Sequence, residues 1–271
     1  MELITNKVIL ISVFLLVVTT IETLAYSTRI SGARIKLIAT ALSLFSTLVI
    51  ISRFSTMIQQ PLTAKLIAEA PDTNKLQFIE EQYRILIGVT SIGVLLGIVL
   101  FPTFINIFSR AIVQLSKERG SLVSLFIKQF NLSGLRKVAK CARMPRWSYL
   151  EGITLKTIPK RLFLINVIIS AVFTTGVLSS IYASMLVPSD YAQAALMSSG
   201  IINGIATILL TLFVDPKASV LADRVVNNQS QYIYLKSYSL TMVSSKLVGT
   251  IAAQLIFIPA AYYVAWFAEW I

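Results

Sequence analysis

Glu22 and Arg53 are the two side chains whose positions point most directly to chemistry, because each lies well inside a long apolar stretch. A charge in membrane hydrocarbon is costly, so such a residue is a functional hypothesis by default. A carboxylate accepts hydrogen bonds or carries a proton, and a guanidinium group holds two phosphate oxygens at once. Counted along their own stretches at ~1.5 Å per residue, the two charges differ in depth by roughly 10 Å. We therefore expect each to have its own partner or water, with no direct ion pair; alternatively, Arg53 reaches outward to the headgroups.

Polar residues recur at helical spacing on the same stretches and on three others. The sets are Thr19, Glu22, Tyr26 and Arg29; Ser46, Arg53, Thr56 and Gln60; Asn166, Ser170 and Thr174; Ser199, Asn203, Thr207 and Thr211; and Thr250 and Gln254. Together they could line a hydrophilic cavity between helices. The structural alternative is that Ser and Thr bond to their own backbone carbonyls and that Asn bonds to a neighbouring helix.

Membrane-spanning helices must position these residues. The chain of 271 residues is 56% apolar and only 13% charged, against roughly 25% charged residues in soluble domains. Its apolar stretches are close to the ~20 residues that an α-helix needs to cross ~30 Å of hydrocarbon. The sequence predicts an all-α polytopic membrane protein, a bundle of about six transmembrane helices in a single domain, 1–271. The expected helices cover about 8–26, 36–58, 85–108, 162–187, 192–214 and 243–268, and a basic amphipathic loop covers 109–161.

Small residues and prolines refine this bundle. The pairs Gly93/Gly97 and Gly200/Gly204 predict close packing of the third and fifth helices against neighbours. Pro259 predicts a kink in the last helix. The first stretch has some features of a secretory signal, but Glu22 fits a cleavage region poorly, so we expect a retained helix.

Several functional classes are not indicated. The chain has one cysteine, Cys141, and no histidine, so we expect no internal disulfide, no metal site and no imidazole proton relay. Phosphate-binding loops, nucleophile elbows, dinucleotide fingerprints and paired acid/base carboxylates do not occur. We therefore expect no cofactor and no enzymatic reaction. Nucleic-acid binding is not expected either, because no folded module interleaves aromatic with basic residues.

Charge predicts the orientation. Residues 110–161 hold twelve Lys or Arg against two Glu, a net charge of +10, which places this segment on the cytoplasmic side. Alternation from there puts both termini outside, and every other connection agrees with the rule. Leu122, Phe126 and Phe130 among polar residues resemble an interfacial helix whose basic neighbours would face anionic lipids. The alternative is that the loop only anchors the topology.

The sequence resembles the Amj-type lipid II flippases, the bacterial alternate to MurJ, nearly from end to end. The resemblance rests on the segments 21–29, 31–34, 43–45, 52–53 and 59–62, and further along on 102–104, 214–217, 223–224, 249–250, 253–254 and 259–261. Its N-terminal part is specific, because charges at fixed places in apolar helices are hard to match by chance. Ile35 stands where the family has Thr, and Ser55 or Thr56 where it has Asn.

The resemblance implies a flippase that moves the undecaprenyl-pyrophosphate-linked peptidoglycan precursor from the inner to the outer leaflet of the bacterial cytoplasmic membrane. The substrate-binding residues that we expect on this basis are Glu22, Arg29, Arg34, Arg53, Gln60, Asp215, Asp223 and Arg224. Arg29 and Arg34 at the cytoplasmic mouth and Arg53 deeper would contact the pyrophosphate in succession. Glu22 would hold an arginine, carry a coupling proton or accept hydrogen bonds from the cargo.

Two other classes remain open. A small-solute or ion transporter would also carry charges near the midplane, whereas a scaffold for cell-wall enzymes needs no polar interior. A flippase cavity should open sideways to the bilayer and be much wider than one solute. Six helices are few for so large a cargo, and a homodimer that shares the path is one arrangement that would supply the width.

Overall fold

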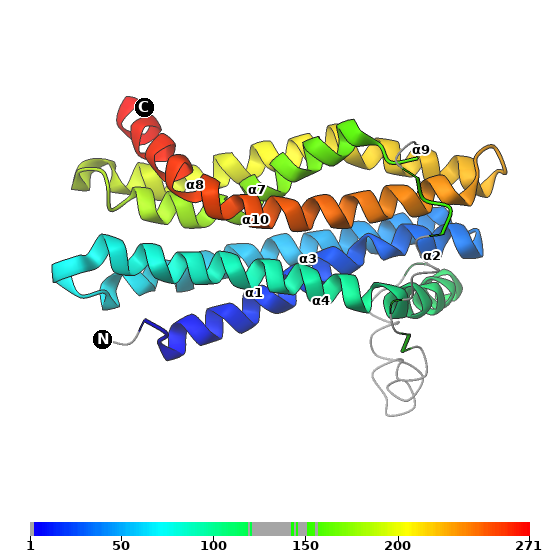
Figure 1. The fold of residues 1–271 in the computed structure, drawn as a ribbon, viewed down its shortest axis with the longest axis horizontal. Helices are drawn as coiled ribbons and strands as arrows, with labels where there is room; N and C mark the ends of the chain where they lie inside the picture. Colours follow the sequence, from blue (N-terminus) through cyan, green and yellow to red (C-terminus); the bar gives the residue numbers. More distant parts are fainter. Residues whose placement is uncertain (1–2, 119, 121–141, 144, 146–150, 155–156) are drawn as a thin grey trace.

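The computed structural model describes residues 3–118, 120, 142–143, 145, 151–154 and 157–271. Within these ranges it is built of helices without strands, and six helical segments are long and apolar enough to cross a membrane. The all-α polytopic bundle is thereby confirmed (Figure 1). The elements are α1 (Asn6–Ala25), α2 (Ser27–Ile35), α3 (Ile38–Ala64), η1 (Lys65–Glu69), η2 (Asp72–Asn74), α4 (Lys75–Lys117), α7 (Lys160–Ala183), α8 (Ser189–Leu209), η4 (Leu210–Val214), α9 (Asp215–Val226) and α10 (Tyr232–Trp270).

The first span is longer than its apolar stretch. The Thr5 hydroxyl caps α1 by accepting from the Val8 amide at 3.3 Å, and after Tyr26 the chain continues as α2 to Ile35. It turns at Lys36, which adopts the left-handed conformation with φ of 59° and lets its amide bond back to Ala33 and Gly32. The residues of α2 are polar, but most are buried by neighbouring helices. Hydropathy therefore missed a helix that tertiary packing stabilises.

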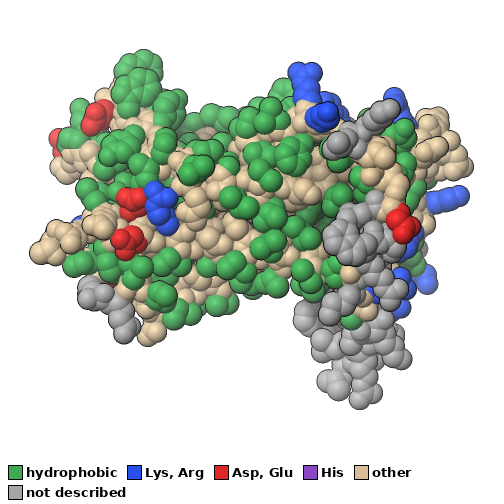
Figure 2. Space-filling model, in the orientation of Figure 1, with side chains coloured by type: hydrophobic (Ala, Val, Ile, Leu, Met, Phe, Trp, Pro, Cys, Tyr) green, Lys and Arg blue, Asp and Glu red, His purple; other side chains and the backbone are tan. Residues whose placement is uncertain are grey.

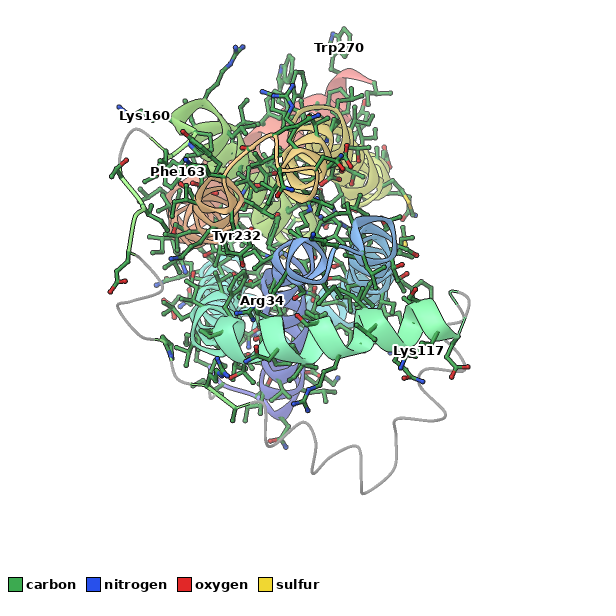
Figure 3. The ribbon with its side chains drawn as sticks, turned by 90° about the vertical axis from the view of Figure 1, so that its right-hand side faces the viewer. Arg34, Lys117, Lys160, Phe163, Tyr232 and Trp270 are labelled. Atoms are coloured by element: carbon green, nitrogen blue, oxygen red, sulfur yellow. The ribbon has the colours of Figure 1, made fainter. Side chains whose placement is uncertain are left out.

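Helix α4 has two parts. Gly93 and Gly97 let its first part lie against α1, since a Cβ at either position would overlap with the side chain of Thr19 or Thr23. Close packing of this pair is confirmed. Beyond Pro102, which has no amide hydrogen for the helical ladder, α4 turns across the end of the bundle (Figures 1 and 3). The predicted interfacial segment 122–130 lies outside the described residues.

The fifth span is interrupted by a π-helical turn. Helix α8 passes through η4, Leu210–Val214, into α9, whose second residue is Pro216. Because Pro216 has no N–H for a helical bond to Leu212, a regular helix would lose a bond at this point. Tyr238 of α10 donates its hydroxyl to the Val214 carbonyl at 3.2 Å. The close packing predicted for the second glycine pair is not observed. Among the described residues, nothing lies within 4 Å of a Cβ built at Gly200 or Gly204, so this side of α8 has no neighbour there.

Helices α7 and α10 pack closely along their lengths. A Cβ at Gly249 would lie 2.6 Å from both the Ser170 Cβ and the Val167 carbonyl oxygen, and Asn166 donates to the Met242 carbonyl at 3.0 Å and to the Ser245 hydroxyl at 2.7 Å. Helix α10 begins at Tyr232, well before the apolar stretch at 243. Beyond Pro259 it tilts away from the bundle axis, as the proline predicts (Figure 1).

Both termini lie at one end of the bundle, together with the connection between α3 and α4, whereas α2 and α9 lie at the other end (Figure 1). On the face shown in Figure 2, Lys and Arg gather mostly at the α2–α9 end and Asp and Glu mostly at the opposite end, with hydrophobic surface between them. The protein is a multi-pass membrane protein.

We predict that a cysteine placed at Lys75, the first residue of α4, is labelled from outside intact cells by a membrane-impermeant maleimide. The native Cys141, in the basic segment and outside the described residues, should react only after the cells are permeabilised. The reason is the net charge of +10 in that segment, which holds it inside. Labelling of Cys141 in intact cells would contradict the orientation.

Candidate functional site

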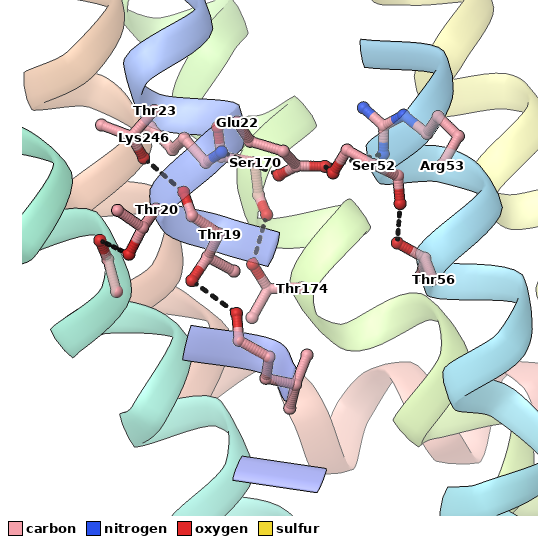
Figure 4. A network of polar contacts seen from close by, with 12 residues as sticks. Thr19, Thr20, Glu22, Thr23, Ser52, Arg53, Thr56, Ser170, Thr174 and Lys246 are labelled. Carbon is pink, nitrogen blue, oxygen red and sulfur yellow. Dashed lines mark hydrogen bonds and ion pairs between the residues drawn. The ribbon is translucent and has the colours of Figure 1, made fainter. Parts of the chain in front are cut away.

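A cluster of three charges joins α1, α3 and α10 in the middle of the bundle. Glu22 of α1 accepts a hydrogen bond from the Lys246 ammonium group of α10 at 2.8 Å and another from the Ser52 hydroxyl of α3 at 2.6 Å. The Arg53 Nη1 atom lies 4.0 Å from the Glu22 Oε1 atom. Figure 4 shows these side chains converging on the Glu22 carboxylate. One carboxylate therefore faces two cations, and the cluster carries a formal net charge of +1.

The sequence-based expectation that Glu22 and Arg53 lie too far apart for an ion pair is wrong. The expected depths of the two charges assumed that the first helix ended at residue 26 and the second began at residue 36. The helical hairpin instead turns at Lys36 after α2, so Glu22 and Arg53 lie at similar distances from the turn on antiparallel helices. Antiparallel positions of that kind share one level of the membrane.

Lys246 was missed by sequence reasoning. It lies at the beginning of the predicted sixth helix, where a lysine normally marks the membrane boundary. Because α10 begins at Tyr232, Lys246 lies well inside the helix, and its side chain is only 10% exposed. The available signal was the repeated spacing of Lys246, Thr250 and Gln254 on one helical face.

The three charges border a small cavity of about 80 Å³. The Arg53 side chain, 27% exposed, packs its guanidinium group 3.4 Å above the Phe173 ring of α7, a cation–π contact. Its Nε atom has no hydrogen-bond partner within the described part of the chain. Glu22 and Arg53, both members of the polar sets that could line a hydrophilic cavity between helices, border this cavity. A site needs roughly 10–15 Å³ for each water, so the cavity has room for only a few waters.

Four of the five polar sets contribute to this cavity, the set on α7 in full and the other three in part. The cavity-lining polar residues are Thr19, Glu22, Tyr26, Arg53, Thr56, Gln59, Thr90, Asn166, Ser170, Thr174, Lys246 and Thr250. Several hydroxyls also bond to their own helix: Thr19 donates to Leu15 at 2.8 Å, and Thr174 to Ser170 at 2.8 Å. These hydroxyl groups therefore form the hydrogen bonds to their own backbone that the structural alternative predicts. The same residues also border the cavity.

The set on α8 does not reach the cavity. Ser199 accepts a hydrogen bond from the Gln60 amide at 2.7 Å, so Gln60 links α3 to α8. Thr207 donates to the carbonyl of Asn203 on its own helix at 2.8 Å. The Asn203 side chain lies against Gly176 of α7, in a contact that a Cβ at Gly176 would disturb. This set thus serves packing between α8 and its neighbours.

Arg29 forms a second buried ion pair, closer to the α2–α9 end. Its side chain is 1% exposed, and its Nη2 atom lies 2.6 Å from the Asp215 carboxylate at the start of α9. The guanidinium group lies 4.0 Å above the Phe45 ring and donates to the Tyr238 hydroxyl at 3.4 Å. Arg29 is thus engaged by α3, α9 and α10, although its Nε atom has no hydrogen-bond partner among the described residues.

The remaining predicted residues lie on the surface of the same end. Arg34 is exposed and donates to the Asn106 side chain of α4 at 3.2 Å. Asp223 and Arg224 are exposed on α9. The arginines therefore do not line one continuous cavity: Arg53 borders the central cavity, Arg29 is enclosed, and Arg34 borders a separate cavity between α2, α4 and α10.

Comparison with known proteins bears on this arrangement. The model of the family described as Amj, alternate to MurJ, matches residues 14–268. The chain is 50% identical over 270 residues to the lipid II flippase Amj of Bacillus subtilis (strain 168), and the alignment covers the full length of both proteins. No solved structure matches the chain. The chain belongs to the Amj family, the alternate to MurJ.

Proposed function

We propose that the protein is a lipid II flippase, a transporter and not an enzyme, which moves undecaprenyl-pyrophosphate-linked peptidoglycan precursor to the outer leaflet for cell-wall synthesis. Full-length identity of 50% to a relative of that name supports the assignment. The structural observation that carries it is the cluster of Glu22, Arg53 and Lys246, whose charges do not cancel and which borders a polar cavity among membrane-spanning helices. A net positive site at that depth attracts an anionic group that must cross.

Arg53 and Lys246 are the groups that would hold the pyrophosphate at the midpoint of the crossing. Arg53 presents a planar fork suited to two phosphate oxygens, and its Nε atom has no partner among the described residues. Glu22 then acts as the resident counter-ion that the two cations share between transport events. Gln60, Asp215, Asp223 and Arg224 remain proposed substrate contacts, reached as the helices move apart.

The cavity of about 80 Å³ is far too small for a disaccharide-pentapeptide, so the described conformation is a closed one. In an open one, helices α1, α3, α7 and α10, which border the cavity, must separate. The α2–α9 end faces the cytoplasm in this proposal, with its basic residues against anionic lipids and both termini outside. A homodimer sharing the path would widen it.

A small-solute or ion transporter is the second candidate, and the small size of the central cavity favours it. The two functions are separated by reconstituting the protein in vesicles and measuring inner-to-outer movement of lipid II and of small ions in parallel. Movement of ions without lipid II would overturn the flippase assignment. Movement of neither would favour the scaffold.

We predict that Arg53→Gln slows lipid II translocation in these vesicles by about ten- to a hundredfold, because a charge-assisted hydrogen bond contributes about 1.5–3 kcal/mol. Arg53→Lys should recover part of the rate, since it keeps the charge but not the fork. Arg161→Gln, which removes an exposed arginine at the start of α7, is the matched control and should leave the rate unchanged. Wild-type rates for Arg53→Gln at equal protein content would remove Arg53 from the site.

A further inference from the structure

A cavity much larger than the central one lies apart from the charge cluster, at the α2–α9 end. Its volume is about 730 Å³, and it is bordered by α2, by α4 on both sides of Pro102, by the start of α10 and by short segments near residues 143–153. Volumes of about 300–1,000 Å³ are typical of ligand sites. Most of its wall is apolar, with Ile30, Phe101, Ile105, Ile233, Leu240 and Val243 among the lining residues.

The polar part of this wall is basic. Arg34, Arg143 and Lys236 line the cavity, and no acidic residue is among the lining residues. Arg34 donates to the Asn106 side chain at 3.2 Å and Lys236 to the Glu151 carbonyl at 3.2 Å, which leaves further donors on both groups. Figure 3 shows Arg34 at the end of the bundle that bears Tyr232, the first residue of α10.

The contrast with the two internal cation sites is informative. Arg29 has Asp215, and Lys246 and Arg53 have Glu22. In the described part of the chain, neither Arg34 nor Lys236 forms an ion pair, although both border a cavity whose wall is mostly apolar. Cations without counter-ions beside such a space fit an amphiphile that carries negative charge at one end of a long apolar chain.

We propose that this cavity binds the first part of the polyprenyl chain of a polyprenyl pyrophosphate lipid, with the pyrophosphate held by Arg34, Lys236 and Arg143. This rests on the proposed function, and it assigns the loading site from which the cargo leaves the inner leaflet. Three lining cations suit the two adjacent phosphates of a pyrophosphate better than the single phosphate of an ordinary phospholipid. The apolar wall then buries the polyprenyl chain through the hydrophobic effect, which requires no directional contacts.

Helix α10 connects this loading site to the central cluster. Lys236 borders the large cavity and Lys246 the small one, and at ~1.5 Å per residue the two positions are about 15 Å apart along the same helix. Leu240 and Val243, between them in sequence, form part of the wall of the large cavity. A pyrophosphate bound at Arg34 and Lys236 is thus about three helical turns from the next pair of cations.

The test is binding of undecaprenyl pyrophosphate to the full-length protein in phosphatidylcholine nanodiscs, with phosphatidylglycerol as competitor. Arg34→Gln combined with Lys236→Gln should weaken binding by about tenfold or more, because two charge-assisted contacts are lost. Arg161→Gln combined with Lys160→Gln removes the same two kinds of cation at the start of α7 and should leave binding unchanged. Leu240→Trp, which fills the cavity, should weaken binding, whereas Val248→Trp at a 43% exposed position of the same helix should not.

Equal affinity of the double glutamine variant and wild type would overturn the proposal, and so would equal competition by phosphatidylglycerol, which would mark a general lipid pocket. If Leu240→Trp fails to fold, the double glutamine variant still tests the proposal, because Arg34 is exposed and Lys236 is partly exposed. If the proposed function fails while the binding site is correct, the measurements give a different result. In that case undecaprenyl pyrophosphate binds and the variants weaken its binding, yet vesicles show no movement of lipid II.

Discussion

Glu22→Gln will lower the stability of the folded protein and abolish lipid II translocation, because it leaves Lys246 and Arg53 without their counter-ion. The Glu22 carboxylate lies 2.8 Å from the Lys246 ammonium group, and the two side chains are 20% and 10% exposed. Removing one partner of a buried pair costs about 3–5 kcal/mol, since the other charge stays buried. Thermal unfolding in detergent and translocation in vesicles measure the two effects separately.

The double variant Glu22→Gln with Lys246→Met provides the decisive comparison. Replacing both members of a buried pair is often neutral for stability, so we expect most of the lost stability to return. Translocation should stay absent, because the central site then lacks Lys246. Glu80→Gln, which breaks a partly exposed pair with Arg84, is the control, with an expected change below about 1 kcal/mol. Recovery of transport in the double variant would show that the cluster serves stability alone.

Arg29→Ala will destabilise the protein, by about 1–3 kcal/mol, because it leaves the Asp215 carboxylate, which is 30% exposed, without its cation. Its guanidinium group is enclosed by Asp215, Phe45 and Tyr238, so the substitution leaves both an unpaired Asp215 carboxylate and a gap beside an aromatic ring. Arg29→Lys should be intermediate, because it keeps the charge and loses the planar group over Phe45. A double-mutant cycle with Asp215→Asn, read by thermal unfolding, should give a coupling above about 1 kcal/mol.

Arg34→Ala is the matched comparison. Arg34 lies on the same helix, five residues further on, but is exposed, so its removal should change stability by less than about 1 kcal/mol while slowing transport. The sequence suggested one role for Arg29, Arg34 and Arg53, namely successive contacts with the pyrophosphate. The structure separates them, and unaltered stability of Arg29→Ala would mean that the Asp215 pair is not formed in the membrane.

The spans could be predicted from sequence because hydrocarbon imposes a length and a composition on each helix. Their ends could not. Helix α2 and the first turns of α10 are rich in polar residues, and many of these side chains, such as Arg29 and Ser237, are buried against other helices. A hydropathy pattern measures the preference for lipid and does not detect helices that prefer the inside of a bundle.

The candidate site, like the spans, could be predicted from the sequence only in part. Glu22 and Arg53 stood out as single charges in apolar surroundings, and the resemblance to the family drew attention to Asp215. The partnership of Arg29 with Asp215 joins residues 186 positions apart, and no local pattern encodes it. Gly200 and Gly204 show the opposite error, since a spacing that permits close approach does not say which face of α8 has a neighbour.

The π-helical turn at Leu210–Val214 fixes the register of everything that follows it in the fifth span. Each residue of an α-helix advances the chain by about 100° around the axis, whereas a π-helical turn holds about one residue more, so a substitution that turned this segment into regular helix without removing a residue would rotate Asp215 by about that angle. The carboxylate would then leave the side of the helix that faces Arg29. The π-helical turn before Asp215 is therefore as much a part of the Arg29–Asp215 pair as the two charged side chains are.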